Sequence, residues 1–198
     1  MNDNAERTDV ILMEIKKLQV ELRDLQKKES RPLDRGYVFS SGQGDVSLED
    51  LFGDKSDLVI IHNMGADCPY CTTYADGING ILHHLENRSA VALLSPDPVS
   101  KQKDFAFSRG WKFRMISSHD HGEDFNSEMG FYQPEGEMAG VWPGFSCFHK
   151  DGDFITRTGF SYFDPGDEYC VLFPMMELLK GGQGDWKPEY KYQLFSQK

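Results

Sequence analysis

The feature that most constrains the fold is an apolar strand that leads into a cysteine pair at the start of a helix. Residues 57–62 read Asp-Leu-Val-Ile-Ile-His, a run typical of a central strand covered on both faces. Gly65 and Ala66 end this run, and Cys68-Pro69-Tyr70-Cys71 follows directly. A helical pattern then continues to about residue 87. This order predicts an α/β domain whose cysteines stand at a strand-to-helix junction.

The rest of the chain continues the alternation of strands and helices. Asp151-Gly152 lies between two strand-like runs, which is a strong signal for a β-hairpin. We therefore predict a central mixed β-sheet flanked by helices. The other predicted elements are a short strand at 37–40, helical turns at 47–52, strands at 90–94, 113–117, 145–149 and 154–158, and helices at 99–108 and 167–180.

An extra N-terminal helix is predicted over residues 8–29. Apolar residues recur there at heptad spacing, at Ile11, Ile15, Leu18, Leu22 and Leu25. This helix either lies on its own domain or pairs with a second copy in a homodimer, and we lean slightly toward the dimer. The expected division is an N-terminal helix at 1–30, a main domain at 31–182 and a C-terminal tail at 183–198.

Composition excludes several classes of partner. The formal net charge is −11, from 32 acidic and 21 basic side chains, so we expect no nucleic-acid partner. No apolar stretch approaches the ~18 residues that would span a bilayer, and the first residues lack the features of a signal peptide. We therefore expect a cytoplasmic protein with no membrane partner. The acidic segment His119–Glu137 is expected to be a solvated loop face.

The position of Cys68 and Cys71 predicts redox chemistry. A thiolate at a helix N-terminus meets unpaired N–H groups and the positive end of the helix dipole, which lower its pKa. Cys68 is the expected nucleophile, and Cys71, one turn further in, is the expected resolving thiol. Asp67 is expected to modulate the site, because its carboxylate opposes thiolate formation. The expected client is a disulfide in a protein or a small thiol compound.

Two alternatives compete with this prediction. A Cys-x-x-Cys pair can be half of a zinc site, but the other two cysteines, Cys147 and Cys170, are 23 positions apart and no second pair exists. The cysteines can also be inert in a non-catalytic binding protein. We expect no metal and no cofactor, and we expect Cys147 and Cys170 to be buried core thiols.

Trp142-Pro143-Gly144 precedes the predicted strand 145–149 and supplies the second half of the expected site. A proline at this point in a redox fold is often cis, and it then presents a backbone edge beside the reactive sulfur. We predict a cis Pro143 that positions the substrate. Pro69, Tyr70, Trp142 and Gly144 complete the expected substrate-binding residues.

These motifs together resemble the thioredoxin superfamily, and the Pro69-Tyr70 dipeptide resembles the glutaredoxin centre. The resemblance extends over Met64–Gly80, Gly110–Phe113, Asp124–Asn126 and Pro143–Phe148. Across these stretches the chain is similar to the bacterial family called domain of unknown function 899. The resemblance implies a thioredoxin-like fold and dithiol–disulfide exchange, with no defined substrate. A glutathione-binding segment is not evident, and Gly65 stands where peroxiredoxins carry Thr or Ser.

Overall fold

The computed structural model describes residues 3–27, 31–33, 36–136 and 139–192. Parts of the predicted N-terminal helix, acidic segment and tail (residues 28–30, 137 and 193–198) lie outside them. The helices are α1 (Asp3–Lys27), α2 (Pro69–Arg88), α3 (Val99–Arg109), α4 (Asp124–Glu128) and α5 (Leu172–Glu177), with a 3-10 turn η1 (Asp50–Phe52). The strands are β1 (Arg31–Pro32), β2 (Val38–Ser41), β3 (Gly44–Ser47), β4 (Asp57–His62), β5 (Ala90–Ser95), β6 (Arg114–Ser117), β7 (Tyr132–Gln133), β8 (Gly140–Val141), β9 (Gly144–Asp151) and β10 (Phe154–Tyr162).

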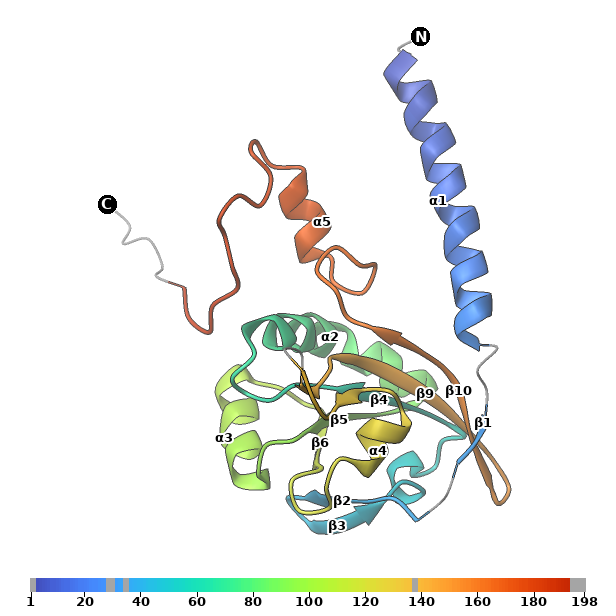
Figure 1. The fold of residues 1–198 in the computed structure, drawn as a ribbon, viewed down its shortest axis with the longest axis vertical. Helices are drawn as coiled ribbons and strands as arrows, with labels where there is room; N and C mark the ends of the chain where they lie inside the picture. Colours follow the sequence, from blue (N-terminus) through green and yellow to red (C-terminus); the bar gives the residue numbers. More distant parts are fainter. Residues whose placement is uncertain (1–2, 28–30, 34–35, 137–138, 193–198) are drawn as a thin grey trace.

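The main sheet is mixed, as the sequence predicts. Its strand order is β1-β10-β9-β4-β5-β6-β2-β3 (Figure 1). Strands β4, β5 and β6 are parallel neighbours, whereas β9 and β10 form an antiparallel hairpin against β4. Parallel neighbours end at the same edge of a sheet, so the loops after β4 and β5 lie together.

Strand β4 lies inside the sheet, and both of its faces are covered by other parts of the domain. Leu58 and Ile60 belong to a core that includes side chains of η1 and α4. Ile61 points to the opposite face, in a core with side chains of α2 and α5. Alternate side chains of β4 therefore pack into two different cores, and these cores hold the strand from which the chain continues to Cys68.

The predicted C-terminal helix at 167–180 is largely wrong, because α5 is confined to Leu172–Glu177. The Asp167 carboxylate accepts hydrogen bonds from the N–H groups of Tyr169 (2.7 Å) and Cys170 (3.2 Å), which holds these residues in a turn. Pro174 has no N–H to donate, so it is tolerated only in the first turn of a helix.

The acidic segment is more ordered than a solvated loop. It contains α4, whose Phe125 and Asn126 are buried in the domain, and Met129 and Phe131 follow in the same core. The described acids of this segment are exposed or half-buried, whereas its apolar residues help to form the core.

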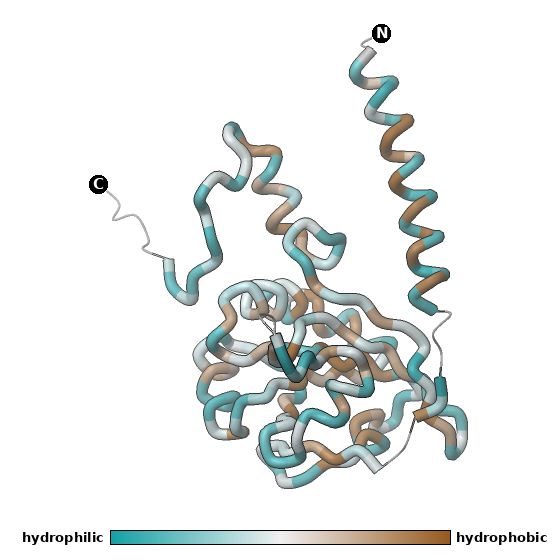
Figure 2. The backbone as a smooth tube through the Cα atoms, viewed as in Figure 1, coloured by the Kyte–Doolittle hydropathy of each residue, from teal (hydrophilic) through white to brown (hydrophobic). Residues whose placement is uncertain are grey.

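Helix α1 stands away from the sheet (Figure 1), and hydrophobic residues recur along its length (Figure 2). The side chains of the predicted heptad are between 44% and 62% exposed. The domain holds the second half of the helix through Arg23, which donates to Glu168 (2.7 Å), and Gln26, which donates to Ser161 (3.1 Å). None of the helices in the described residues is both long and apolar enough to cross a membrane.

Candidate active site

Cys68 caps helix α2 with its own sulfur. Its backbone is extended (φ −103°, ψ 103°), and its Sγ accepts a hydrogen bond from the N–H of Cys71 at 3.1 Å. Pro69 occupies the first turn of the helix, where its missing N–H leaves no bond unmade. The sequence Cys-Pro-x-Cys therefore begins the helix with a thiol where Ser or Asp usually stands.

This capping position favours the thiolate. The pKa of Cys68 is lowered from about 9 to about 7, chiefly by a hydrogen bond from the Cys71 side chain and further by the backbone N–H groups of Cys71 and Tyr70. Burial opposes the shift. At neutral pH, Cys68 is divided between thiol and thiolate.

The other three cysteines behave differently. Cys71 is 3% exposed, and its hydrogen bond to Cys68, its burial and the charge of Cys68 all raise its pKa far above the usual range. Burial also raises the pKa of Cys147, to about 11, and that of Cys170. Each of the four is a free thiol in this structure. Cys68 is the one with a lowered pKa, as expected for the nucleophile.

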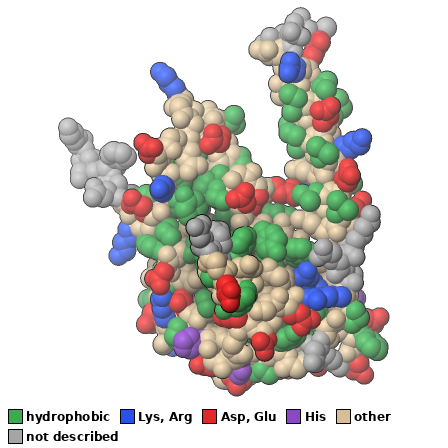
Figure 3. Space-filling model, in the orientation of Figure 1, with side chains coloured by type: hydrophobic (Ala, Val, Ile, Leu, Met, Phe, Trp, Pro, Cys, Tyr) green, Lys and Arg blue, Asp and Glu red, His purple; other side chains and the backbone are tan. Residues whose placement is uncertain are grey.

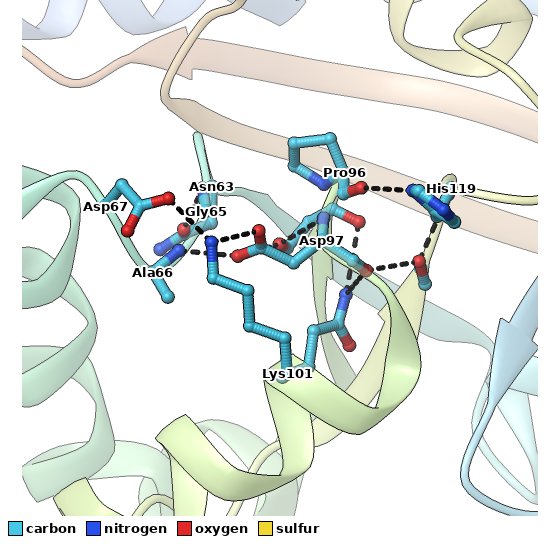
Figure 4. A network of polar contacts seen from close by, with 11 residues as sticks. Asn63, Gly65, Ala66, Asp67, Pro96, Asp97, Lys101 and His119 are labelled. Atoms are coloured by element: carbon cyan, nitrogen blue, oxygen red, sulfur yellow. Dashed lines mark hydrogen bonds and ion pairs between the residues drawn. The ribbon is translucent and has the colours of Figure 1, made fainter.

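The loop before Cys68 is held by the end of strand β5. The N–H of Ala66 donates to Asp97 Oδ2 at 2.6 Å, and the N–H of Gly65 donates to Asn63 Oδ1 at 2.8 Å (Figure 4). Gly65 has φ +106°, and a Cβ there would lie 2.8 Å from Asp97 Oδ2. A Thr or Ser at position 65 is therefore incompatible with this loop.

Asp67 does not act as an isolated charge beside the thiol. Its carboxylate is 90% exposed and lies 2.6 Å from Lys101 Nζ, which also lies 2.9 Å from Asp97 Oδ1. Figure 4 shows Lys101 reaching between the two acids from helix α3. The hydrogen bonds to Asp67 and Asp97 raise the pKa of Lys101 above its usual range, so the ammonium persists. The predicted opposition from Asp67 is thus offset by a bound cation.

The prediction of a cis Pro143 is wrong, because the described residues contain no cis peptide bond and the Trp142–Pro143 bond is trans. Hydrogen bonds fix the chain on both sides of this bond. The N–H of Trp142 donates to Phe131 O at 2.8 Å, and Pro143 O accepts from the N–H of Phe163 at 3.0 Å. These two hydrogen bonds therefore hold the chain in a path into β9 that contains the trans bond.

Pro143 still lies beside the dithiol. A cleft of about 500 Å³ is lined by Cys68, Tyr70, Cys71, Trp142 and Pro143, so the structure brings most of the predicted site together. Gly144 is instead buried against the start of the hairpin, where a Cβ would lie 2.3 Å from Ser161 O. Pro69 and Gly144 do not line the cleft.

Sequence reasoning missed several residues of the site. Asp97 and Lys101 follow β5 as Cys68 follows β4, so the rule that parallel neighbours end at one edge gives the signal that could have found them. Tyr74 and Phe163 also line the cleft, with their rings stacked at 4.4 Å. Phe163 follows an antiparallel strand, and no local pattern marks it.

His62, at the end of β4, is a buried polar group that the sequence did not single out. Its Nδ1 lies 2.8 Å from Asn126 Oδ1 and its Nε2 lies 3.0 Å from Ser146 Oγ. Burial lowers the pKa of His62 to about 3, so the imidazole is neutral. It joins α4 and β9 to the strand that delivers the cysteines, and it lies on the opposite face from the dithiol.

No set of three or more His, Cys, Asp or Glu side chains placed to hold a metal occurs within the ranges that the structure describes. The fold and this site define a thioredoxin-like protein with a Cys-x-x-Cys dithiol at the start of a helix. The chain belongs to the family described as "Bacterial protein of unknown function (DUF899)", whose sequence model matches residues 12–194.

Several peroxiredoxins are among the solved structures with a similar fold. Peroxiredoxin Q of Xanthomonas campestris is 20% identical, with a TM-score of 0.53 over 65% of this chain and 80% of that one. Peroxidoxin BcpB of Mycobacterium tuberculosis is 18% identical, with a TM-score of 0.51 over 64% and 80%. Among curated proteins, none matches the chain. At these identities the likeness supports the fold alone.

Proposed function

We propose that this protein is a dithiol–disulfide oxidoreductase that uses Cys68 and Cys71. The observation that carries the proposal is the sulfur of Cys68 at the N-cap of α2, which accepts the N–H of Cys71 and has a pKa lowered to about 7. The cytoplasmic location expected from the sequence is part of the proposal.

The reaction has two steps that balance. The Cys68 thiolate attacks one sulfur of a client disulfide and forms a mixed disulfide, and the other client sulfur leaves as a thiolate. Cys71 then loses its proton and attacks Cys68 Sγ. The second client sulfur leaves, and the Cys68–Cys71 disulfide holds the two oxidising equivalents. A dithiol donor reverses the change in the enzyme, and the reduction potential sets the direction of flux.

The surroundings of Cys71 support its role as the thiol that acts second. While Cys68 is a thiolate, the hydrogen bond from Cys71 and the repulsion between the sulfurs hold the Cys71 pKa high. A mixed disulfide removes the charge on Cys68, so two of these causes disappear. Burial then remains as the cause that opposes deprotonation of Cys71.

A trapping experiment tests the proposal. The Cys71→Ser variant should accumulate a stable mixed disulfide through Cys68 when it is incubated with lysate under non-reducing conditions. The Cys68→Ser/Cys71→Ser variant, which retains Cys147 and Cys170, is the matched control. Equal recovery of adducts from both variants would contradict the proposal.

The competing hypothesis is a non-catalytic binding protein whose cysteines hold a metal or are inert. Both forms of this hypothesis predict no exchange with disulfides, and the metal-binding form also predicts stoichiometric zinc in freshly purified protein. The lowered pKa of Cys68 favours the oxidoreductase, because an inert pair gains nothing from a thiolate at neutral pH.

We also propose that residues 1–30 form a dimerisation element outside the thioredoxin-like domain at 31–182, with residues 183–198 as a tail. The supporting observation is the exposed heptad of α1, whose apolar side chains lie along the surface in Figure 3. Five acidic and five basic residues within 9–29 balance its charge, so a second copy of the helix meets no net repulsion.

A further inference from the structure

The cleft beside the dithiol has walls of apolar and aromatic side chains. Met64 and Val141 join Tyr70, Tyr74, Trp142 and Phe163 around the sulfur of Cys68. Two contacts make one wall rigid. Tyr74 donates its hydroxyl to Asp164 O at 2.8 Å, and its ring stacks on Phe163. A group bound next to Cys68 would therefore lie against fixed rings.

Within the part of the chain that the structure describes, the lining of the cleft includes an acidic residue but no basic residue. Among the described residues that line it, none is Lys, Arg or His, and one, Asp164, is acidic. Lys101 is the first basic residue after β5. Its ammonium pairs with Asp67 and Asp97, and the residue lines a different pocket. Glutathione disulfide carries more carboxylates than ammonium groups, and this cleft gives those carboxylates no cation.

Main-chain recognition is also restricted. The N–H of Trp142 and the carbonyl of Pro143, which flank the trans bond, already bond to Phe131 and Phe163. A peptide that lies beside Pro143 as an added strand would have to compete with these bonds. Burial of apolar side chains is the interaction that the cleft itself offers.

We propose that the cleft binds an uncharged, apolar or aromatic group next to the sulfur of the client disulfide and discriminates against anionic disulfides such as that of glutathione. This inference rests on the proposed function and assigns its substrate class. Trp142 and Tyr70 are the specificity-determining residues, because they contact the group attached to the attacked sulfur.

The test uses disulfides that differ at one side chain. N-acetylated, C-amidated dipeptides Phe-Cys, Ser-Cys and Glu-Cys, each as its homodimeric disulfide, and glutathione disulfide are mixed with the reduced protein. Each rate of Cys68–Cys71 oxidation is divided by the rate of the same probe with dithiothreitol, which cancels intrinsic reactivity. We expect the Phe probe to exceed the Ser probe about tenfold, with the Glu probe and glutathione disulfide slower than the Ser probe.

Variants locate the effect. Trp142→Ala should reduce the preference for the Phe probe over the Ser probe to about threefold or less. Tyr70→Ser tests the same preference at a side chain in the first turn of α2, and it should also reduce it. Phe107→Ala is the control, because Phe107 is 87% exposed on α3 and outside the cleft. Met64→Lys adds a cation to the lining, and it should raise the relative rate of glutathione disulfide severalfold.

The outcomes separate the two levels of the proposal. Equal normalised rates for the Phe, Ser and Glu probes, or an unchanged preference in both Trp142→Ala and Tyr70→Ser, would overturn the assigned substrate class while leaving the oxidoreductase intact. For each probe, the rate of Cys68–Cys71 oxidation and the rate of dithiothreitol oxidation are each divided by the thiolate concentration. If the protein is not the faster of the two with any probe, the proposed function itself fails.

Discussion

At the scale of single residues, the reactivity of Cys68 depends on what donates to its sulfur. The Cys71 thiol and the N–H groups of Cys71 and Tyr70 all stabilise the thiolate. These donors arise from the start of a helix and not from a neighbouring cation. The thiol is thus activated mainly by the Cys71 thiol and further by backbone N–H groups, so its pKa is sensitive to changes in the first turn of α2.

The first prediction concerns the pH dependence of alkylation. A lowered pKa means that the Cys68 thiolate fraction rises with pH around 7, where an ordinary thiol would titrate near 9. Iodoacetamide labelling of Cys68, followed by mass spectrometry, should show a midpoint near pH 7. Cys71→Ala should raise this midpoint because it removes a donor, whereas Cys71→Ser keeps a donor and should stay closer to the parent. A midpoint near 9 in the parent would contradict this account.

The second prediction concerns Lys101. Lys101→Met leaves the carboxylates of Asp67 and Asp97 without their shared cation, so the negative charge beside Cys68 increases. The alkylation midpoint should rise, by less than about one pH unit because the pair is solvent-accessible and screened. Lys101→Arg keeps the charge and serves as the control. Restoration of the midpoint in Asp67→Asn/Lys101→Met would show that the effect passes through Asp67, and an unchanged midpoint in Lys101→Met would exclude it.

At the scale of secondary-structure elements, periodicity in the sequence predicted most of what positions the site. The strand at 57–62, the helix that begins at the cysteine pair and the 90–94 strand are present, because apolar runs and glycine breaks are local signals. The trans bond at Pro143 and the short α5 were missed. The chain path at Pro143 includes a hydrogen bond from the distant Phe163, which no local pattern encodes. The turn at Asp167 and Tyr169 is a local signal that the helical pattern of 167–180 outweighed.

Helix α1 gives the third prediction. If its heptad pairs with a second copy, Ile15→Glu/Leu18→Glu/Leu22→Glu should convert a dimer to a monomer, as measured by light scattering of the full chain. These side chains are exposed, so the substitutions should not unfold the domain. Met13→Gln/Val20→Gln removes exposed apolar groups outside the heptad and is the control. An unchanged mass in the triple variant would exclude pairing through this helix.

At the scale of the whole molecule, two cores on opposite faces of one sheet fix the edge at which the site forms. The loops after β4 and β5 meet there, so Asp97 and Lys101 hold the chain that enters the cysteine helix (Figure 4). The segments around Trp142 and Phe163 close the cleft from the hairpin side. Residues far apart in the sequence thus build the surroundings of the dithiol, which is why the motif could be predicted and the cleft could not.

The central claim is that Cys68 and Cys71 form one reversible redox couple. Equilibration of the protein with graded ratios of reduced and oxidised dithiothreitol, with the free thiols counted by mass spectrometry, tests it most directly. We predict a single two-electron transition, with about 30 mV per tenfold change in ratio, that is lost in Cys68→Ser and in Cys71→Ser and kept in Cys147→Ser. The absence of a transition, or its persistence in Cys71→Ser, would contradict the claim.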